Sequence, residues 1–63
     1  MGSIQMEHGG KVYEAEYFVD RGVITVCGER GQESTQIGGA GEQLVAKLLL
    51  NNLIRKGQID PAN

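Results

Sequence analysis

Hydrophobic and polar residues alternate through the first part of the chain, whereas the second part carries one continuous apolar segment. From Ser3 to Ile37, short alternating stretches are separated by glycine, which is typical of strands joined by turns. The segment EQLVAKLLLNNLIRK, residues 42–56, places apolar residues at the three- and four-residue spacing of a helix. We therefore expect an α+β fold in which strands come first and one helix, residues 41–56, follows.

Glycine-containing turns determine how the expected strands pair. Gly9 and Gly10 supply the positive φ angles of a two-residue hairpin loop, so residues 3–8 should pair with residues 11–20. Loops centred on Arg21-Gly22 and Arg30-Gly31 should then add strands 23–29 and 32–37 in turn. A three-residue loop with a bulge is the alternative at both of these later turns. The sequence thus predicts a four-stranded antiparallel β-meander within a single domain of residues 1–63.

The expected registers collect apolar side chains on one face of the sheet. They set Ile4 opposite Ala15 and Tyr17 opposite Val26, and they set Val26 opposite Thr35. One apolar face and one mostly polar face is the arrangement required when a helix covers a sheet on one side. The expected core residues of the sheet are Ile4, Met6, Tyr13, Ala15, Tyr17, Val19, Ile24, Val26 and Ile37. The expected outer residues are Glu14, Glu16, Phe18, Thr25, Cys27, Glu29, Ser34 and Gln36.

The predicted helix has a wider apolar arc than one small sheet is expected to cover. Lys47, Asn51 and Arg55 form a single narrow polar stripe because they are spaced four residues apart. The apolar flanks of this stripe are Leu44 with Leu48 on one side and Leu50 with Ile54 on the other. Burying an exposed Leu or Ile contributes roughly 1.5–3 kcal/mol, so pairing these flanks between two copies favours a homodimer. The alternative is a monomer in which a curled sheet and the chain ends cover the helix.

The segments on either side of the helix are glycine-rich or polar. Gly38–Gly41 is interpreted as a flexible connector, with anion binding by free backbone N–H groups as a minor alternative. It lacks the Lys-Ser/Thr that completes a phosphate-binding loop. Gly57 is expected to end the helix, and the tail, residues 58–63, should be loosely held.

Length and cysteine content limit what can stabilise this chain. At 63 residues it lies near the lower size limit for a domain that folds alone. Cys27 is the only cysteine, so an intrachain disulfide is impossible, and no Cys–His cluster indicates a zinc site. We expect neither a metal nor a cofactor. Oligomerisation is then the remaining source of extra stability.

The sequence predicts an intracellular location. The first ten residues lack the basic and apolar regions of a secretory signal, and the run LVAKLLL is too short to span a bilayer. A single unpaired cysteine favours a reducing compartment. We therefore expect a cytoplasmic protein of bacterial or phage type with no membrane partner.

Catalysis is not expected from this composition. The chain has one His and one Cys, and a four-stranded sheet with one helix leaves little room for a water-excluding pocket. Glu14 is expected to face Glu29 on the outer face, which we interpret as a solvated acidic surface. Phe18 is expected on the same face, where it forms a modest apolar patch. The favoured hypothesis is a non-enzymatic interaction or regulatory module that associates through Leu44, Leu48, Leu50, Ile54 and Phe18, with a larger protein partner left open.

A nucleic-acid-binding domain is the competing hypothesis. It would use basic residues at the turns and on the helix, namely Arg21, Arg30, Lys47, Arg55 and Lys56. The net charge of −2 and the acidic outer face weigh against it, because binding to phosphates requires a basic surface. Nucleic acid is therefore not the expected partner.

Overall fold

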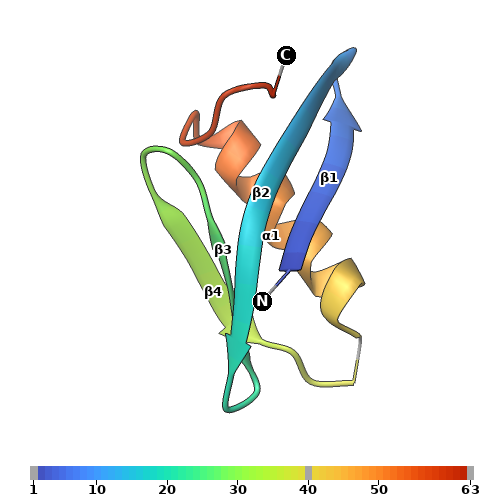
Figure 1. The fold of residues 1–63 in the computed structure, drawn as a ribbon, viewed down its shortest axis with the longest axis vertical. Helices are drawn as coiled ribbons and strands as arrows, with labels where there is room; N and C mark the ends of the chain where they lie inside the picture. Colours follow the sequence, from blue (N-terminus) through green and yellow to red (C-terminus); the bar gives the residue numbers. More distant parts are fainter. Residues whose placement is uncertain (1, 40, 63) are drawn as a thin grey trace.

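The computed structural model describes residues 2–39 and 41–62, and it has the predicted ββββα architecture. The elements are β1 (Gly2–His8), β2 (Lys11–Asp20), β3 (Val23–Cys27), β4 (Gln32–Gln36) and α1 (Glu42–Arg55). The four strands form one antiparallel sheet in the order β1-β2-β3-β4. α1 crosses one face of this open sheet and leaves the opposite face uncovered (Figure 1). The prediction of an α+β meander followed by a helix is confirmed.

The first two hairpins have the predicted registers. In the first, Gly9 and Gly10 have φ angles of 61° and 80°, and the residues that flank them pair directly. In the second, Arg21 and Gly22 have φ angles of 54° and 78°. Two consecutive residues at positive φ form the turn whose twist matches that of the flanking strands. The turn residues alone therefore determine how β1, β2 and β3 pair.

β3 and β4 pair in a register two residues away from the predicted one. Val26 lies opposite Glu33 rather than Thr35, and Ile24 lies opposite Thr35 rather than Ile37. A shift of two residues preserves the alternation of side chains, so every residue of β4 keeps its predicted face. The hydrophobic pattern cannot distinguish these two registers, because the strand carries no apolar residue that would mark one of them.

The altered register arises from a wider loop. β3 ends at Cys27, and residues 28–31 form a four-residue connection in which the Gly28 N–H donates to the Gly31 carbonyl at 2.7 Å. The ladder between β2 and β3 consequently stops at the Glu16–Cys27 pair. The predicted juxtaposition of Glu14 and Glu29 is therefore wrong.

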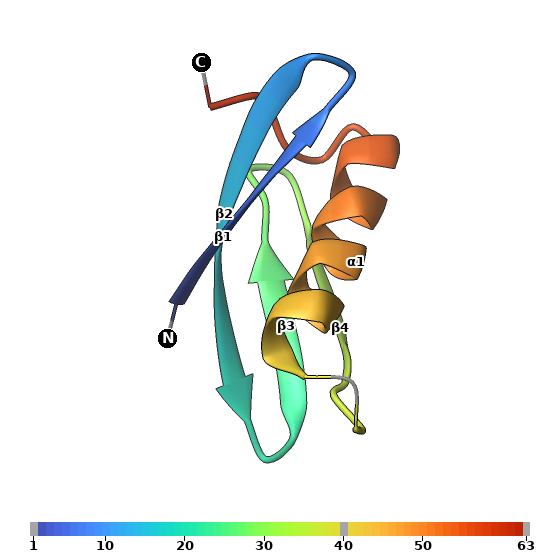
Figure 2. The same cartoon turned by 90° about the vertical axis from the view of Figure 1, so that its right-hand side faces the viewer.

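The C-terminal tail packs against the molecule instead of lying loosely held. Gly57, with a φ of 70°, ends α1, and the Gln58 N–H donates to the Leu53 carbonyl at 2.9 Å. This is the hydrogen bond that closes a Schellman motif. Ile59 then enters the core with only 6% of its surface exposed. From the end of α1 the tail runs to the sheet (Figure 2). Residues 59–62 lie beside the part of β2 that does not pair with β3, with Ile59 in the core.

The last part of the tail lies beside β2. The Ala62 N–H donates to the Val12 carbonyl at 2.7 Å. Val12 belongs to residues 11–15 of β2, which extend beyond the part of the strand that pairs with β3. The tail therefore satisfies a β2 backbone group for which β3 is too short.

Two glycines allow the tail to approach the loop closely. A Cβ atom on Gly28 would lie 2.7 Å from the Gln58 carbonyl oxygen, and one on Gly31 would lie 2.6 Å from the Gln58 side-chain amide carbon. Both distances are shorter than atoms tolerate, so a side chain at Gly28 requires the tail backbone to move and one at Gly31 requires the Gln58 side chain to move. These glycines are needed for close contact between two segments distant in the sequence.

The core lies between α1, the covered face of the sheet and the tail. Its members are Ile4, Ala15, Tyr17, Ile24, Val26, Val45, Ala46, Leu49, Leu50, Leu53 and Ile59. Met6, Tyr13 and Ile37 pack at its margin, as expected for residues on the covered face. Val19 differs from the prediction, since 36% of its surface is exposed. It precedes the β2–β3 turn, which extends beyond the N-terminal end of α1 (Figure 2).

Candidate functional site

The solvent-facing side of α1 carries two leucines that the monomer does not cover. Leu44 and Leu48 are 56% and 58% exposed. Lys47, Asn51 and Arg55 follow at the spacing that places them on the same side of a helix. These five residues, here called the outer helix surface, lie opposite the buried residues of α1. An apolar pair flanked by two cations is the most distinctive exposed feature of the described helix.

The other predicted helix flank belongs to the core of a single chain. Leu50 is fully buried, and Ile54 packs against the core at its margin. The prediction of Leu50 as an interface residue is therefore wrong. Buried residues of α1 cover an arc of about 140° at 100° per residue, because the twisted sheet and Ile59 together enclose more of the helix than a flat sheet would. Of the two predicted flanks, Leu44 with Leu48 remains available to a partner.

The uncovered face of the sheet is acidic and carries an exposed aromatic residue on the inner strand β2. Phe18 is 44% exposed and lies opposite Thr25 of β3. Glu14, Glu16 and Asp20 lie an even number of residues away from it and so share its face of β2, and all three are exposed. We call these four residues of β2 the outer sheet surface. None of the residues of β1–β4 that alternate onto this face is Lys or Arg.

A hydrogen bond between the buried Thr25 and the exposed Ser34 supports this surface from the neighbouring strands. Thr25 is buried, and its side-chain oxygen lies 2.8 Å from that of Ser34, with which it shares a hydrogen bond. Thr25 lies between Phe18 and Ser34 in the row of paired residues across β2, β3 and β4. The hydrogen bond therefore joins β3 to β4 beside the exposed ring.

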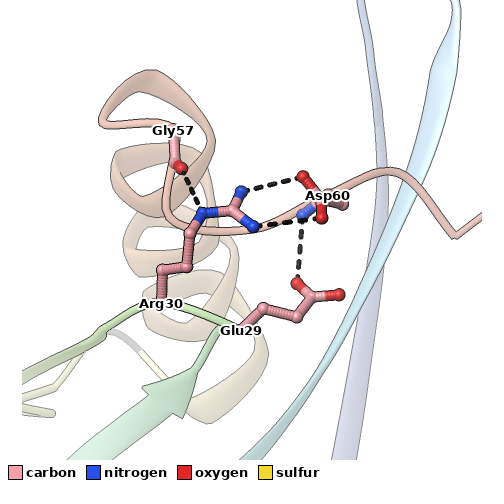
Figure 3. Close-up of polar contacts among 4 residues, drawn as sticks. All are labelled: Glu29, Arg30, Gly57 and Asp60. Atoms are coloured by element: carbon pink, nitrogen blue, oxygen red, sulfur yellow. Dashed lines mark hydrogen bonds and ion pairs between the residues drawn. The ribbon is translucent and has the colours of Figure 1, made fainter.

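Arg30 joins the β3–β4 loop to the tail (Figure 3). Its guanidinium donates to both carboxylate oxygens of Asp60, at 3.1 and 2.8 Å, and its Nε donates to the Gly57 carbonyl at 3.0 Å. The Asp60 N–H donates to the Glu29 carboxylate at 3.0 Å. The hydrogen bond and the charge of Arg30 lower the pKa of Asp60, and the same two effects of Asp60 raise the pKa of Arg30. This cluster connects the loop to the tail by hydrogen bonds.

The five basic residues considered for nucleic-acid binding do not form one surface. Arg30 is paired with Asp60, and Lys56 lies 2.6 Å from the carboxylate of Glu33. Arg21 is in the β2–β3 turn, at the opposite end of the molecule from the C-terminal end of α1 (Figure 2). Lys47 and Arg55 lie on the outer helix surface, and Arg55 also lies beside Lys56 at the end of α1.

Other candidate chemistry is sparse in the part of the chain that the structure describes. His8 packs edge-on against Tyr13, with ring centroids 6.4 Å apart, and Cys27 is a free, partly buried thiol. Within residues 2–39 and 41–62, no group of three His, Cys, Asp or Glu side chains is placed to hold a metal. A shallow hollow at the end of α1 is lined by Asn52, Arg55 and Lys56.

The connector before α1 has no clear ligand site among its described residues. Gly41 precedes the helix with a φ of 91°, and no side chain caps the helix N-terminus. The anion-binding alternative involves residues 38–41, and Ala40 in this segment lies outside the described residues. No described helix has the length and apolar character needed to cross a membrane.

Sequence reasoning missed the docked tail, although the tail contains a signal. Ile59 is an isolated apolar residue two positions after the helix stop, Gly57, and Asp60 follows it. Together with Arg30 in a loop bounded by two glycines, this combination is compatible with a packed tail.

The chain matches none of the protein-family models, curated proteins or solved structures with which it was compared.

Proposed function

We propose that this chain is a small non-enzymatic interaction module that self-associates through its outer helix surface. The supporting observation is the exposure of Leu44 and Leu48, of which more than half remains accessible to solvent in a folded monomer. Burying each side chain in a contact contributes roughly 1.5–3 kcal/mol, and two leucines are available on every copy. We also infer a cytoplasmic location, which the unpaired Cys27 favours.

The gain from association is large relative to the stability of so small a domain. A folded chain of this length has a free energy of unfolding of roughly 3–9 kcal/mol. Association of the native state adds to this value, because a partner that binds only folded protein shifts the folding equilibrium. The exposed leucines thus provide a means of stabilisation that requires neither a disulfide nor a metal.

Replacing both leucines by glutamine tests this function. In the Leu44→Gln/Leu48→Gln variant the apolar contact is lost, while net charge and helix propensity are nearly unchanged. Light scattering should give a mass above that of the monomer for the original protein at high concentration, and the monomer mass for the variant. The control is Gln43→Ala, which changes an exposed helix residue outside this surface and should associate normally. An unchanged mass in the double variant would contradict the proposal.

A further inference from the structure

We propose that the outer helix surface of one copy docks on the outer sheet surface of another, so that copies assemble head to tail. This inference rests on the proposed function, since it names the surface that covers Leu44 and Leu48. It assigns a role to the one face of the sheet that α1 leaves uncovered (Figure 1).

The two surfaces are opposite in charge. Glu14, Glu16 and Asp20 are exposed on the sheet, and the ion pairs formed within the described residues include none of them. Lys47 and Arg55 are exposed on the helix and likewise take part in neither ion pair. Each surface therefore presents charges that the other can pair.

A symmetric contact between two helices lacks this complementarity. It would bring the outer helix surfaces of both copies together, and their charged members, Lys47 and Arg55, all carry the same sign. Juxtaposed like charges oppose association. Docking on the sheet instead places both cations against carboxylates while the sheet surface covers the leucines.

The spacing of charges along the two elements also agrees. Glu16 and Asp20 are four residues apart on β2, a separation of about 13 Å at the rise of a strand. Lys47 and Arg55 are eight residues apart on α1, a separation of about 12 Å at the rise of a helix. Phe18 lies midway between the two acids. On the helix, Asn51 lies midway between the two cations, while Leu48 follows Lys47 directly and Leu44 lies about one turn before it. One orientation of the helix along β2 therefore pairs both charges and covers the two leucines near the acid that pairs with Lys47.

The geometry of a single chain prevents its outer helix surface from covering its own outer sheet surface. α1 lies on one side of the sheet, so its solvent-facing side and the outer sheet surface point in opposite directions (Figure 2). One molecule can thus use both surfaces at once, each with a different neighbour. Such heterologous contacts produce a ring if they close and an open chain if they do not. A contact made by one 14-residue helix is small, so we expect weak, salt-sensitive association.

Two variants, each defective in one surface, test the inference. Leu44→Gln/Leu48→Gln removes the helix contact and keeps the sheet, and Glu16→Lys/Asp20→Lys reverses the sheet charge and keeps the helix. Each variant alone should be monomeric by analytical ultracentrifugation, whereas an equimolar mixture should form a 1:1 complex and nothing larger. Added salt should weaken this complex. Circular dichroism establishes that each variant is folded, and Glu14→Lys/Glu16→Lys replaces the second variant if it is not.

The other outcomes separate failure of this inference from failure of the proposed function. If the sheet variant associates like the original protein while the helix variant is monomeric, helices pair with one another and head-to-tail docking is wrong. Two monomeric variants that form no complex when mixed also overturn it. If the original protein is monomeric at every concentration, or if the helix variant associates normally, the proposed function fails as well.

Discussion

Replacing Leu50 by alanine should lower the free energy of unfolding by about 2–5 kcal/mol. Leu50 is fully buried among the residues of α1 and the sheet, so the substitution removes apolar contacts and leaves a cavity. Because the whole domain is stable by only roughly 3–9 kcal/mol, the substitution should remove a large fraction of its stability. Urea unfolding followed by circular dichroism at low protein concentration measures the change without a contribution from association.

Leu48→Ala is the matched control for this substitution. The residue type, the helix and the number of deleted atoms are the same, but Leu48 is 58% exposed. Its effect on the monomer should stay within about 0.5 kcal/mol. A Leu50→Ala variant that keeps its stability but loses association would instead place Leu50 in an interface, contrary to the structure.

Replacing Ile59 by alanine should have an effect of the same size, a loss of about 2–5 kcal/mol. Ile59 lies in a tail segment, yet it belongs to the core cluster and is only 6% exposed. Loss of its side chain should also release the segment that bonds to Val12 of β2. Urea unfolding measures the stability, and amide hydrogen exchange at residues 58–62 reports whether the tail detaches.

Asp60→Asn provides the comparison within the tail. It weakens the pairing with Arg30, but both side chains are largely exposed, at 50% for Arg30 and 59% for Asp60. Exposed ion pairs contribute little to stability, so this variant should be much less destabilised than Ile59→Ala. Equal losses in the two variants would mean that the polar cluster contributes as much to stability as burial of Ile59, contrary to this expectation.

The first two hairpins could be predicted from the sequence, because residues next to one another in the chain determine them. Gly9-Gly10 and Arg21-Gly22 specify two-residue turns, and the alternation of β2 then confirms the registers of three strands. The third hairpin could not be predicted in this way, because its loop adopts a shape that depends on contacts with Gln58 and Asp60. β4 itself is too polar to signal which of two equivalent registers is correct.

For the candidate site on the helix too, contacts with distant parts of the chain decide what the local sequence cannot. Leu44 and Leu50 are on opposite flanks of one polar stripe, and the apolar pattern does not tell which flank the monomer covers. The twist of the sheet and the position of the tail decide, and both are properties of the assembled chain. The sequence therefore identified a residue of the exposed surface, Leu44, together with a core residue, Leu50, as equivalent candidates.

Amide chemical shifts of the ¹⁵N-labelled protein, recorded as a function of its concentration, test the self-association proposal most directly. Between about 10 µM and about 1 mM, a range suited to weak contacts, the amides of residues 44–55 should shift progressively with concentration. Head-to-tail docking predicts that residues 14–20 of β2 shift with the same midpoint. Spectra that do not change over this range, or changes confined to the free edges of β1 and β4, would contradict association through the outer helix surface.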